Sequence, residues 1–258
     1  MNRRLVRLTL IASLSMLGLG AVASSASATY HENRIREIHE TGADGDYVVL
    51  QAFSAGENFT ANKQVVTYNG GGAIVSHVVL SNVGNGANQA TILVGDTGVA
   101  GADATDAGFD VINTGGTVCF SEGILIVPPP TGVDCVAYDG NSTGFIGPTV
   151  PPASAYGTPL QLGAPDFNGK SIVRSIARGC ATSLDAADDT NDSAADFSVS
   201  TSTNPRNNAS PITETVCPPG NPNSPTNPAG KTRKRKCKKK QKRSAQVAKK
   251  KKCKKKKK

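Results

Sequence analysis

Five aspartates and one asparagine fall within the twelve residues from Asp185 to Asp196. Oxygen ligands at this density are the kind that Ca²⁺ prefers, which makes Asp188, Asp189 and Asp192 candidate calcium ligands. The segment lacks the glycine and the terminal glutamate of an EF-hand loop. Aspartate side chains also satisfy backbone N–H groups in turns. A structural turn is therefore the preferred interpretation, and no metal ligand is assigned.

No other set of side chains matches a catalytic site. His31, Glu32, His39 and Glu40 gather near the N-terminus, but a spacing of eight residues along a strand places no two of them reliably together, and exposed edge positions are expected. No serine lies in a G-x-S-x-G turn. The glycines at 70–72 are not followed by the Lys and Ser or Thr of a phosphate-binding loop. The sequence predicts neither an enzyme nor a cofactor.

The most specific chemical signal is electrostatic. Nineteen of the 29 Lys and Arg residues lie between Lys231 and Lys258, a segment without a single acid. Such lysines neutralise phosphates and release counterions, so this polybasic tail should bind polyanions in a salt-sensitive way. No aromatic residue interleaves the lysines, so base stacking and sequence selectivity are not expected. The candidate polyanion-binding residues are Lys234, Arg235, Lys236, Lys238, Lys239, Lys240, Lys250, Lys251, Lys252, Lys254 and Lys255.

The rest of the chain has the opposite charge. Residues 29–230 carry seven Lys or Arg against all 20 Asp and Glu of the chain. Outside a cell, the expected partner of the tail is an anionic wall polymer or lipid surface, and extracellular nucleic acid is the alternative. A third interpretation makes the tail a tether that docks on the acidic body of a neighbouring chain.

Residues 1–28 have the features of a removable secretory signal. Arg3, Arg4 and Arg7 form a charged start, an apolar stretch follows from Leu8 to Ala23, and Ala26-Ser27-Ala28 supplies a small-residue cleavage site. The alternative is an uncleaved membrane anchor, for which the apolar run is short and interrupted by Ser and Gly. The chain is therefore expected to be secreted or held at the extracellular cell surface.

Export makes disulfides plausible for the four cysteines in or beside the body of the chain. Four cysteines allow three connectivities, of which we favour Cys119–Cys135 with Cys180–Cys217. The first pair brackets a segment that resembles a hairpin with a long loop, and closing it is worth about 3 kcal/mol. The rival is a zinc site, but no C-x-x-C spacing occurs and the three histidines are scattered.

The elements that must position these residues are strands. Short Val, Ile and Leu runs separated by Gly, Asn, Thr and Ser predict strands at 34–38, 46–53, 64–68, 73–80, 90–94, 117–120, 124–127, 134–138, 170–177 and 196–199. Asn69 and the three glycines after it predict a hairpin. The strand at 34–38 lacks a clean inward face, because Ile35 and Ile38 fall on opposite sides of a regular strand. Strands at this spacing predict an all-β antiparallel sandwich or barrel.

Three stretches resemble the lamin tail domain family in its bacterial secreted branch, over about residues 32–206. They are Ile35-Arg36-Glu37-Ile38 with Asp46-Tyr47-Val48-Val49-Leu50; Ile92-Leu93-Val94-Gly95-Asp96; and Gly169-Lys170-Ser171-Ile172-Val173-Arg174-Ser175 with Asp188-Asp189-Thr190-Asn191-Asp192, Asp196-Phe197 and Asn204-Pro205. The resemblance implies an immunoglobulin-like β-sandwich that serves as a binding or attachment module without catalysis.

The expected organisation has four parts. A signal peptide at 1–28 precedes a β-sandwich domain at 29–206, in which 139–169 form one long ordered loop. A Pro/Asn-rich linker follows at 207–230, because this segment has too few large apolar residues to offset the entropy of ordering it. The tail at 231–258 is expected to be disordered, since its lysines repel one another.

Overall fold

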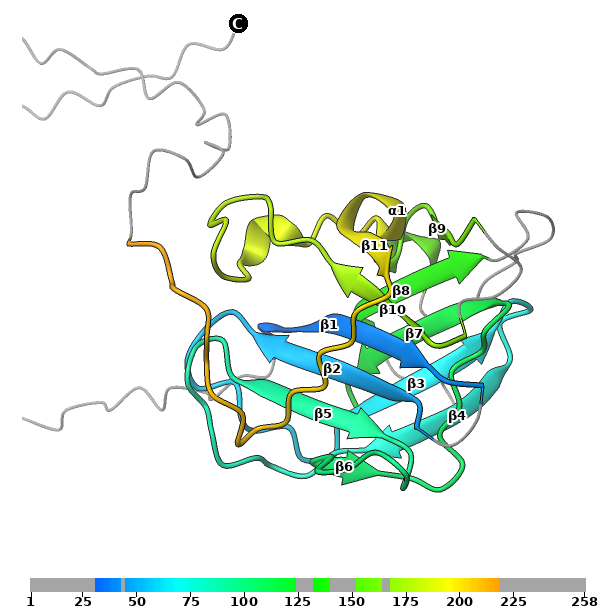
Figure 1. Cartoon of the computed structure of the whole chain (residues 1–258), viewed down its shortest axis with the longest axis horizontal. Coiled ribbons are helices and arrows are strands. Elements are labelled where there is room, and N and C mark those ends of the chain that lie inside the picture. The colour runs from blue at the N-terminus through cyan, green and yellow to red at the C-terminus, as the bar shows by residue number, and fades with distance from the viewer. Residues whose placement is uncertain (1–30, 43–44, 124–131, 140–151, 164–167, 219–258) are drawn as a thin grey trace, which may run out of the picture. The chain divides into compact units, whose positions relative to one another are not determined.

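The computed structural model describes residues 31–42, 45–123, 132–139, 152–163 and 168–218. The predicted signal peptide, the strand expected at 124–127 and the polybasic tail with all its candidate binding residues lie outside these ranges. Within them, two β-sheets pack face to face, which confirms the predicted all-β sandwich (Figure 1).

The first sheet has the strand order β11-β10-β1-β2-β5-β6. All of its neighbours are antiparallel except the last pair. Its strands are β1 (Asn33–Glu40), β2 (Tyr47–Ala52), β5 (Thr91–Gly95), β6 (Ala104–Thr105), β10 (Lys170–Arg174) and β11 (Phe197–Ser200).

The second sheet has the order β4-β3-β7-β8-β9, and its last pair is again parallel. Its strands are β3 (Gln64–Asn69), β4 (Ile74–Val79), β7 (Gly115–Ser121), β8 (Gly132–Asp139) and β9 (Leu160–Gln161). The sequence did not predict β6 or β9, because each is only two residues long and shows no alternation. The helical pieces are η1 (Ala153–Ala155), η2 (Ala186–Asp188) and α1 (Ser193–Asp196).

The predicted hairpin between β3 and β4 is confirmed. The Asn69 side-chain oxygen accepts hydrogen bonds from the N–H groups of Gly71 and Ala73, each at 3.0 Å. Gly72 has φ of +82°, a conformation that a residue without a Cβ adopts at no steric cost. The turn therefore depends on the Asn69 side chain at its start and on Gly72 shortly before β4.

The main core lies between the two sheets. It contains Val48 and Leu50 of β2, Ile92 and Val94 of β5, and a facing set from the second sheet that includes Val65, Val118, Phe120 and Val136. These side chains alternate with residues on the outer faces, as a period of two requires. Burial of this set supplies the main driving force for pairing the sheets.

A β-bulge in β1 resolves the irregular pattern seen in the sequence. The pairing of β1 with β2 shifts between Ile35 and Glu37, so that Arg36 is the inserted residue. The shift allows Ile35 and Ile38 both to face the core, where each is fully buried. Arg36 and Glu37 are turned together to the outer face of the first sheet, where they line a pocket.

A C-terminal strap, residues 201–217, runs across this outer face over β1, β2 and β5 (Figure 1). Asn208 is its main anchor: its side chain is buried, accepts from the Asn85 N–H at 2.6 Å and donates to the carbonyl oxygens of Asn85 and Thr91, each at 3.0 Å. The sequence placed a linker from residue 207 onward, whereas residues 207–217 are held on the domain. The sequence did not predict that residues 207–217 belong to the domain, because hydrogen bonds and a disulfide hold them there and apolar burial does not.

Both favoured cysteine pairs lie at disulfide distance. Cys119 and Cys135 are directly opposite each other on β7 and β8, with 4.2 Å between their Cα atoms. Cys180 joins Cys217 at the end of the strap, with a Cα separation of 5.6 Å. The second bond ties the strap to the loop that follows β10.

Candidate functional site

The Asp185–Asp196 segment forms a turn whose carboxylates bind backbone N–H groups. Asp188 is buried and accepts from the N–H groups of Arg178 at 2.9 Å and Asp185 at 3.1 Å. Asp192 accepts from the Ala195 N–H at 3.0 Å and caps α1. Among the described residues, no group of three or more His, Cys, Asp or Glu is arranged to hold a metal ion.

The third calcium candidate, Asp189, belongs to a buried ion-pair network centred on Arg174. Burial disfavours its ionised form, but the guanidinium groups of Arg174 and Arg34 more than offset this and lower the pKa of Asp189. Its carboxylate lies 2.5 Å from Arg34 and 3.4 Å from Arg174. The three calcium candidates therefore have separate structural partners: Asp188 and Asp192 bind backbone N–H groups, and Asp189 binds arginines.

The sequence predicted exposed edge positions for the His and Glu residues near the N-terminus, and this prediction is wrong for two of them. His39 and Glu40 lie on the central strand β1 and are buried, while His31 is exposed. The His39 ring packs on the Tyr47 ring at 4.9 Å, and its Nδ1 lies 2.7 Å from the Lys170 carbonyl oxygen. Internal packing of β1 accounts for these contacts.

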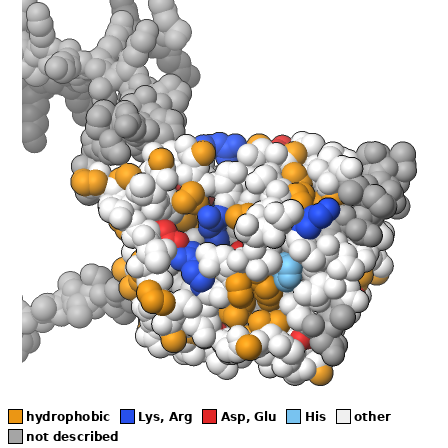
Figure 2. All heavy atoms as spheres, viewed as in Figure 1, with side chains coloured by type: hydrophobic (Ala, Val, Ile, Leu, Met, Phe, Trp, Pro, Cys, Tyr) orange, Lys and Arg blue, Asp and Glu red, His pale blue; other side chains and the backbone are white. Residues whose placement is uncertain are grey.

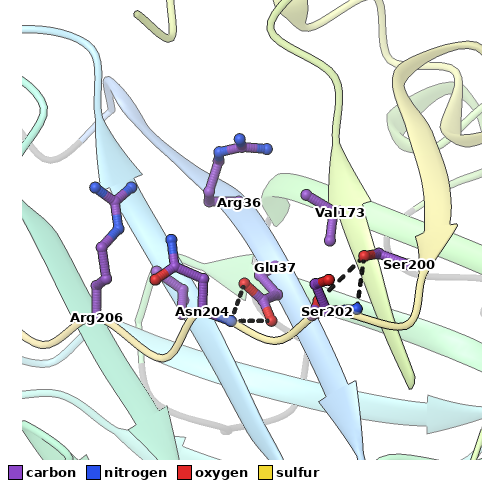
Figure 3. A pocket seen from close by; sticks show the side chains of 8 residues that line it. Arg36, Glu37, Val173, Ser200, Ser202, Asn204 and Arg206 are labelled. Atoms are coloured by element: carbon purple, nitrogen blue, oxygen red, sulfur yellow. Dashed lines mark hydrogen bonds between the residues drawn. The ribbon is translucent and has the colours of Figure 1, made fainter. Parts of the chain in front are cut away.

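A hollow on the outer face of the first sheet lies between that sheet and the strap, and we call it the strap pocket (Figure 3). Its volume is about 190 Å³. Its lining comprises Arg36, Glu37, Val49 and Val173 from the sheet, Ser200 at the end of β11, and Ser202, Asn204 and Arg206 from the strap. The bulge in β1 supplies Arg36 and Glu37, and the strap supplies the opposite wall. The pocket therefore depends on both the bulge and the strap.

Glu37 lies at the base of the pocket and is already fully hydrogen-bonded. Its carboxylate accepts from Tyr47 Oη and Ser171 Oγ, each at 2.7 Å, and from the Asn204 N–H at 3.0 Å. The side chain thus holds the strap against β1. In Figure 3 it is directed toward the strap backbone, away from the Arg36 guanidinium.

Two guanidinium groups give the pocket its electrostatic character. Arg206 pairs with Glu214 at 2.6 Å, whereas Arg36 donates to the Arg174 carbonyl oxygen and forms no ion pair with a described residue. Burial lowers the pKa of Arg36, and the positive charge of Arg206 lowers it further. On the face seen in Figure 2, basic and acidic side chains lie near the centre, among apolar ones.

The lining of the strap pocket is rich in hydrogen-bond donors. It contains no His or Cys, and its one carboxylate is occupied by the hydrogen bonds described above. Ser200 Oγ donates to the Ser202 carbonyl oxygen at 3.1 Å and accepts from the Ser202 N–H at 3.0 Å, so the strap backbone holds this hydroxyl. Its two guanidinium groups, one side-chain amide and two hydroxyls are groups that recognise anions or polar ligands.

Comparisons with known proteins identify no relative: no family model, curated protein or solved structure matches the chain. Among the described residues, no helix has the length and hydropathy needed to cross a membrane. The two cystine pairs are compatible with an extracellular protein.

The sequence did not single out any residue of the strap pocket as functional. The one available signal was the break in alternation at Arg36, which places a cation where an ordinary strand would have an apolar residue. Ser202, Asn204 and Arg206 carry no signal of their own, because their position on the pocket depends on how the strap folds back.

The strap should be sensitive to acid through Glu214. Burial opposes ionisation of this side chain, but the Arg206 guanidinium and the Gln51 amide lower its pKa from 4.5 to about 2. A carboxyl group with a lowered pKa stabilises the fold above its unfolded-state pKa, and this contribution is lost as the pH falls through the folded-state value. At pH 7 the free energy of unfolding of the wild type should thus be higher than that of Glu214→Gln. The difference should be about 1 kcal/mol or less, because solvent screens a partly exposed ion pair.

Chemical denaturation at a series of pH values tests this expectation. The difference between the two proteins should close as the pH falls from 4.5 toward 2. Glu122→Gln is the matched control, because the Glu122 side chain is 44% exposed and its one ion pair with a described residue is a long contact to His31 at 3.8 Å. A difference that stays constant down to pH 2 would show that Glu214 acts through shape and not through charge.

Proposed function

We propose that this chain is an exported, envelope-associated binding protein, in which a lamin-tail-like sandwich is attached to anionic polymers through the polybasic tail at 231–258. The observation that carries the proposal is the segregation of charge: 19 basic residues without an acid in the tail, and seven against 20 acids between residues 29 and 230. The β-sandwich, the two cystine pairs and a pocket without a catalytic pair support a role in binding.

Burial of the acids favours an external polyanion over the body of a neighbouring chain. Nine acidic side chains of the body are buried, where they bind turns and arginines. A basic segment cannot reach these carboxylates without unfolding the domain. The described acids that are exposed are Asp103, Asp106 and Asp110, in the segment between β5 and β7. This is a small surface for a tail with 19 positive charges.

Nucleic acid outside the cell is the second candidate. The lysines of the tail would bind its phosphates without reading sequence, because no aromatic side chain lies among them. Binding to both polymers should weaken with salt, so salt dependence alone does not separate them. Competition between DNA and purified wall polymer for the intact chain does.

Removal of residues 231–258 is expected to release the protein from cells into the medium. The matched control keeps the tail length and replaces its 19 basic residues with glutamine. For six to ten phosphate contacts, the affinity of the intact chain should fall roughly 10³–10⁵-fold between about 50 and 200 mM salt. Equal cell association of the intact and truncated chains at low salt would reject attachment through the tail. Preference for DNA over wall polymer would favour the second candidate.

A further inference from the structure

Arg36 differs from every other described arginine. The remaining four in the described ranges, Arg34, Arg174, Arg178 and Arg206, each form an ion pair with an aspartate or glutamate. Arg36 is partly buried on the bulge of β1 and makes no such pair. A guanidinium group removed from water without a counterion costs free energy. An unpaired cation beside a pocket therefore points to an anion that is supplied by a ligand.

The surroundings of Arg36 are set up to donate hydrogen bonds. The Arg206 guanidinium projects to the same side as Arg36 in Figure 3, with the Asn204 side chain between them in that view. The side chains of Asn204 and Ser202 form no hydrogen bond with any described residue and are exposed. Guanidinium, amide and hydroxyl groups can together surround the oxygens of one anion from several directions.

Two features limit what the strap pocket can hold. At about 190 Å³ it is smaller than the roughly 300–1,000 Å³ pockets of drug-sized ligands, so it suits a single group with its immediate attachments. The negative charges of Glu37 and Glu214 partly offset the lowering of the Arg36 pKa, so some negative charge already lies near this guanidinium. A ligand with one negative charge is therefore favoured over a ligand with two.

We propose that the strap pocket binds one phosphodiester group, with Arg36 as its principal cation and Arg206, Asn204 and Ser202 as additional donors. A phosphodiester carries one negative charge and has a tetrahedral centre that donors can approach from several sides. Arginine binds phosphate oxygens through a pair of parallel N–H groups, which lysine cannot do. The phosphodiester can belong to a lipid headgroup or to a glycerol-phosphate polymer, since both present the same chemistry.

This proposal does not depend on the tail. The pocket is built from residues 36–206, whereas the proposed attachment depends on residues 231–258. A chain with a neutral tail should still bind through the pocket, and a chain with an altered pocket should still bind polyanions through its tail. If both sites engage one polymer, the second contact becomes intramolecular and strengthens the first.

The direct test is a titration of the ¹⁵N-labelled chain with dimethyl phosphate at constant ionic strength. Saturable shifts are expected for the Arg36 Nε–Hε signal and for the amides of Ser202 and Asn204. Arg36→Gln should weaken binding about tenfold or more, because it removes a charged donor. Lys170→Gln is the matched control, since it removes one positive charge from the same sheet outside the pocket.

Asn204→Ala provides a second variant that should fold, because its exposed side chain makes no hydrogen bond with a described residue. It should weaken binding several-fold. Shifts that grow linearly without saturation, or equal affinity in Arg36→Gln and wild type, would overturn the proposal, as would tighter binding of acetate than of dimethyl phosphate. With a neutral tail, phosphatidylglycerol vesicles and soluble glycerol-phosphate polymer then show which source is bound, and failure of both to bind would limit the site to free phosphodiesters.

Discussion

Replacement of Arg174 by methionine is expected to lower the free energy of unfolding by about 3–5 kcal/mol at pH 7. The Arg174 side chain is 1% exposed and lies 2.7–2.8 Å from both carboxylate oxygens of Asp134, which is 2% exposed. It also donates to the carbonyl oxygens of Ile35 and Asp188 and lies over the Phe197 ring at 4.4 Å. Methionine would fill part of the volume but leave Asp134 buried without its cation.

Equilibrium urea unfolding of the oxidised chain measures this loss. Arg178→Met is the matched control: Arg178 pairs with Asp196 of the same network at 2.5 Å, but its side chain is 37% exposed. Pairs of this kind contribute about 1 kcal/mol or less, so the control should stay close to wild type.

A double variant separates charge from packing. Arg174→Met with Asp134→Asn removes the buried charge that the single variant leaves behind, and it should recover a large part of the loss. If the double variant is as unstable as the sum of the two single ones, the cost lies in packing against Phe197 and not in the ion pair. A single variant within about 0.5 kcal/mol of wild type would contradict the importance assigned to the network.

The second large effect concerns the bond between Cys180 and Cys217. These residues are 37 apart in sequence, and closing a loop of this length is worth about 4 kcal/mol in the chain-entropy model. Replacement of both by serine should therefore destabilise the domain by up to this amount. It should also free the end of the strap, where Thr215 N–H donates to the Thr182 carbonyl at 3.1 Å beside the bond.

Hydrogen exchange of the strap amides reports this second effect separately from global stability. Protection at Asn204 and Asn208 should fall in the serine variant, because these amides donate to Glu37 and Asp103 and so hold the strap on the domain. Dithiothreitol should reduce Cys180–Cys217 before Cys119–Cys135, since Cys217 is partly exposed and Cys119 is fully buried. Undiminished protection of the strap without the disulfide would mean that Asn208 and its partners suffice.

The sequence predicted the sandwich well because its central strands follow a regular pattern. Residues such as Val48, Leu50, Ile92 and Val94 alternate or cluster as buried strands do, and the hairpin after Asn69 has a local turn signal. The cystine pairs followed from a small number of cysteines in a chain that the sequence predicts to be exported. The family resemblance has no match among known proteins to support it and stays a proposal.

The candidate site was beyond sequence reasoning for a physical reason. Arg36 and Arg206 are 170 positions apart in numbering and meet only because the strap folds back over β1. The strap is polar, so no hydrophobic period marks it as part of the domain. Its anchor, Asn208, forms bonds to Asn85 and Thr91, more than a hundred residues earlier in the chain. Such long-range polar contacts leave no local pattern in the sequence.

The position of Cys217 has a mechanical consequence. The disulfide bond joins Cys217 to Cys180 of the domain. Every residue after Cys217 in the chain, including the whole tail, is therefore attached to the domain at this bond. A pulling force on the tail, for example from shear on a surface-bound molecule, would enter the domain at Cys180. The strap hydrogen bonds lie between the two cysteines, so they would bear little of that load. The pocket could then keep its shape while the tail is under tension.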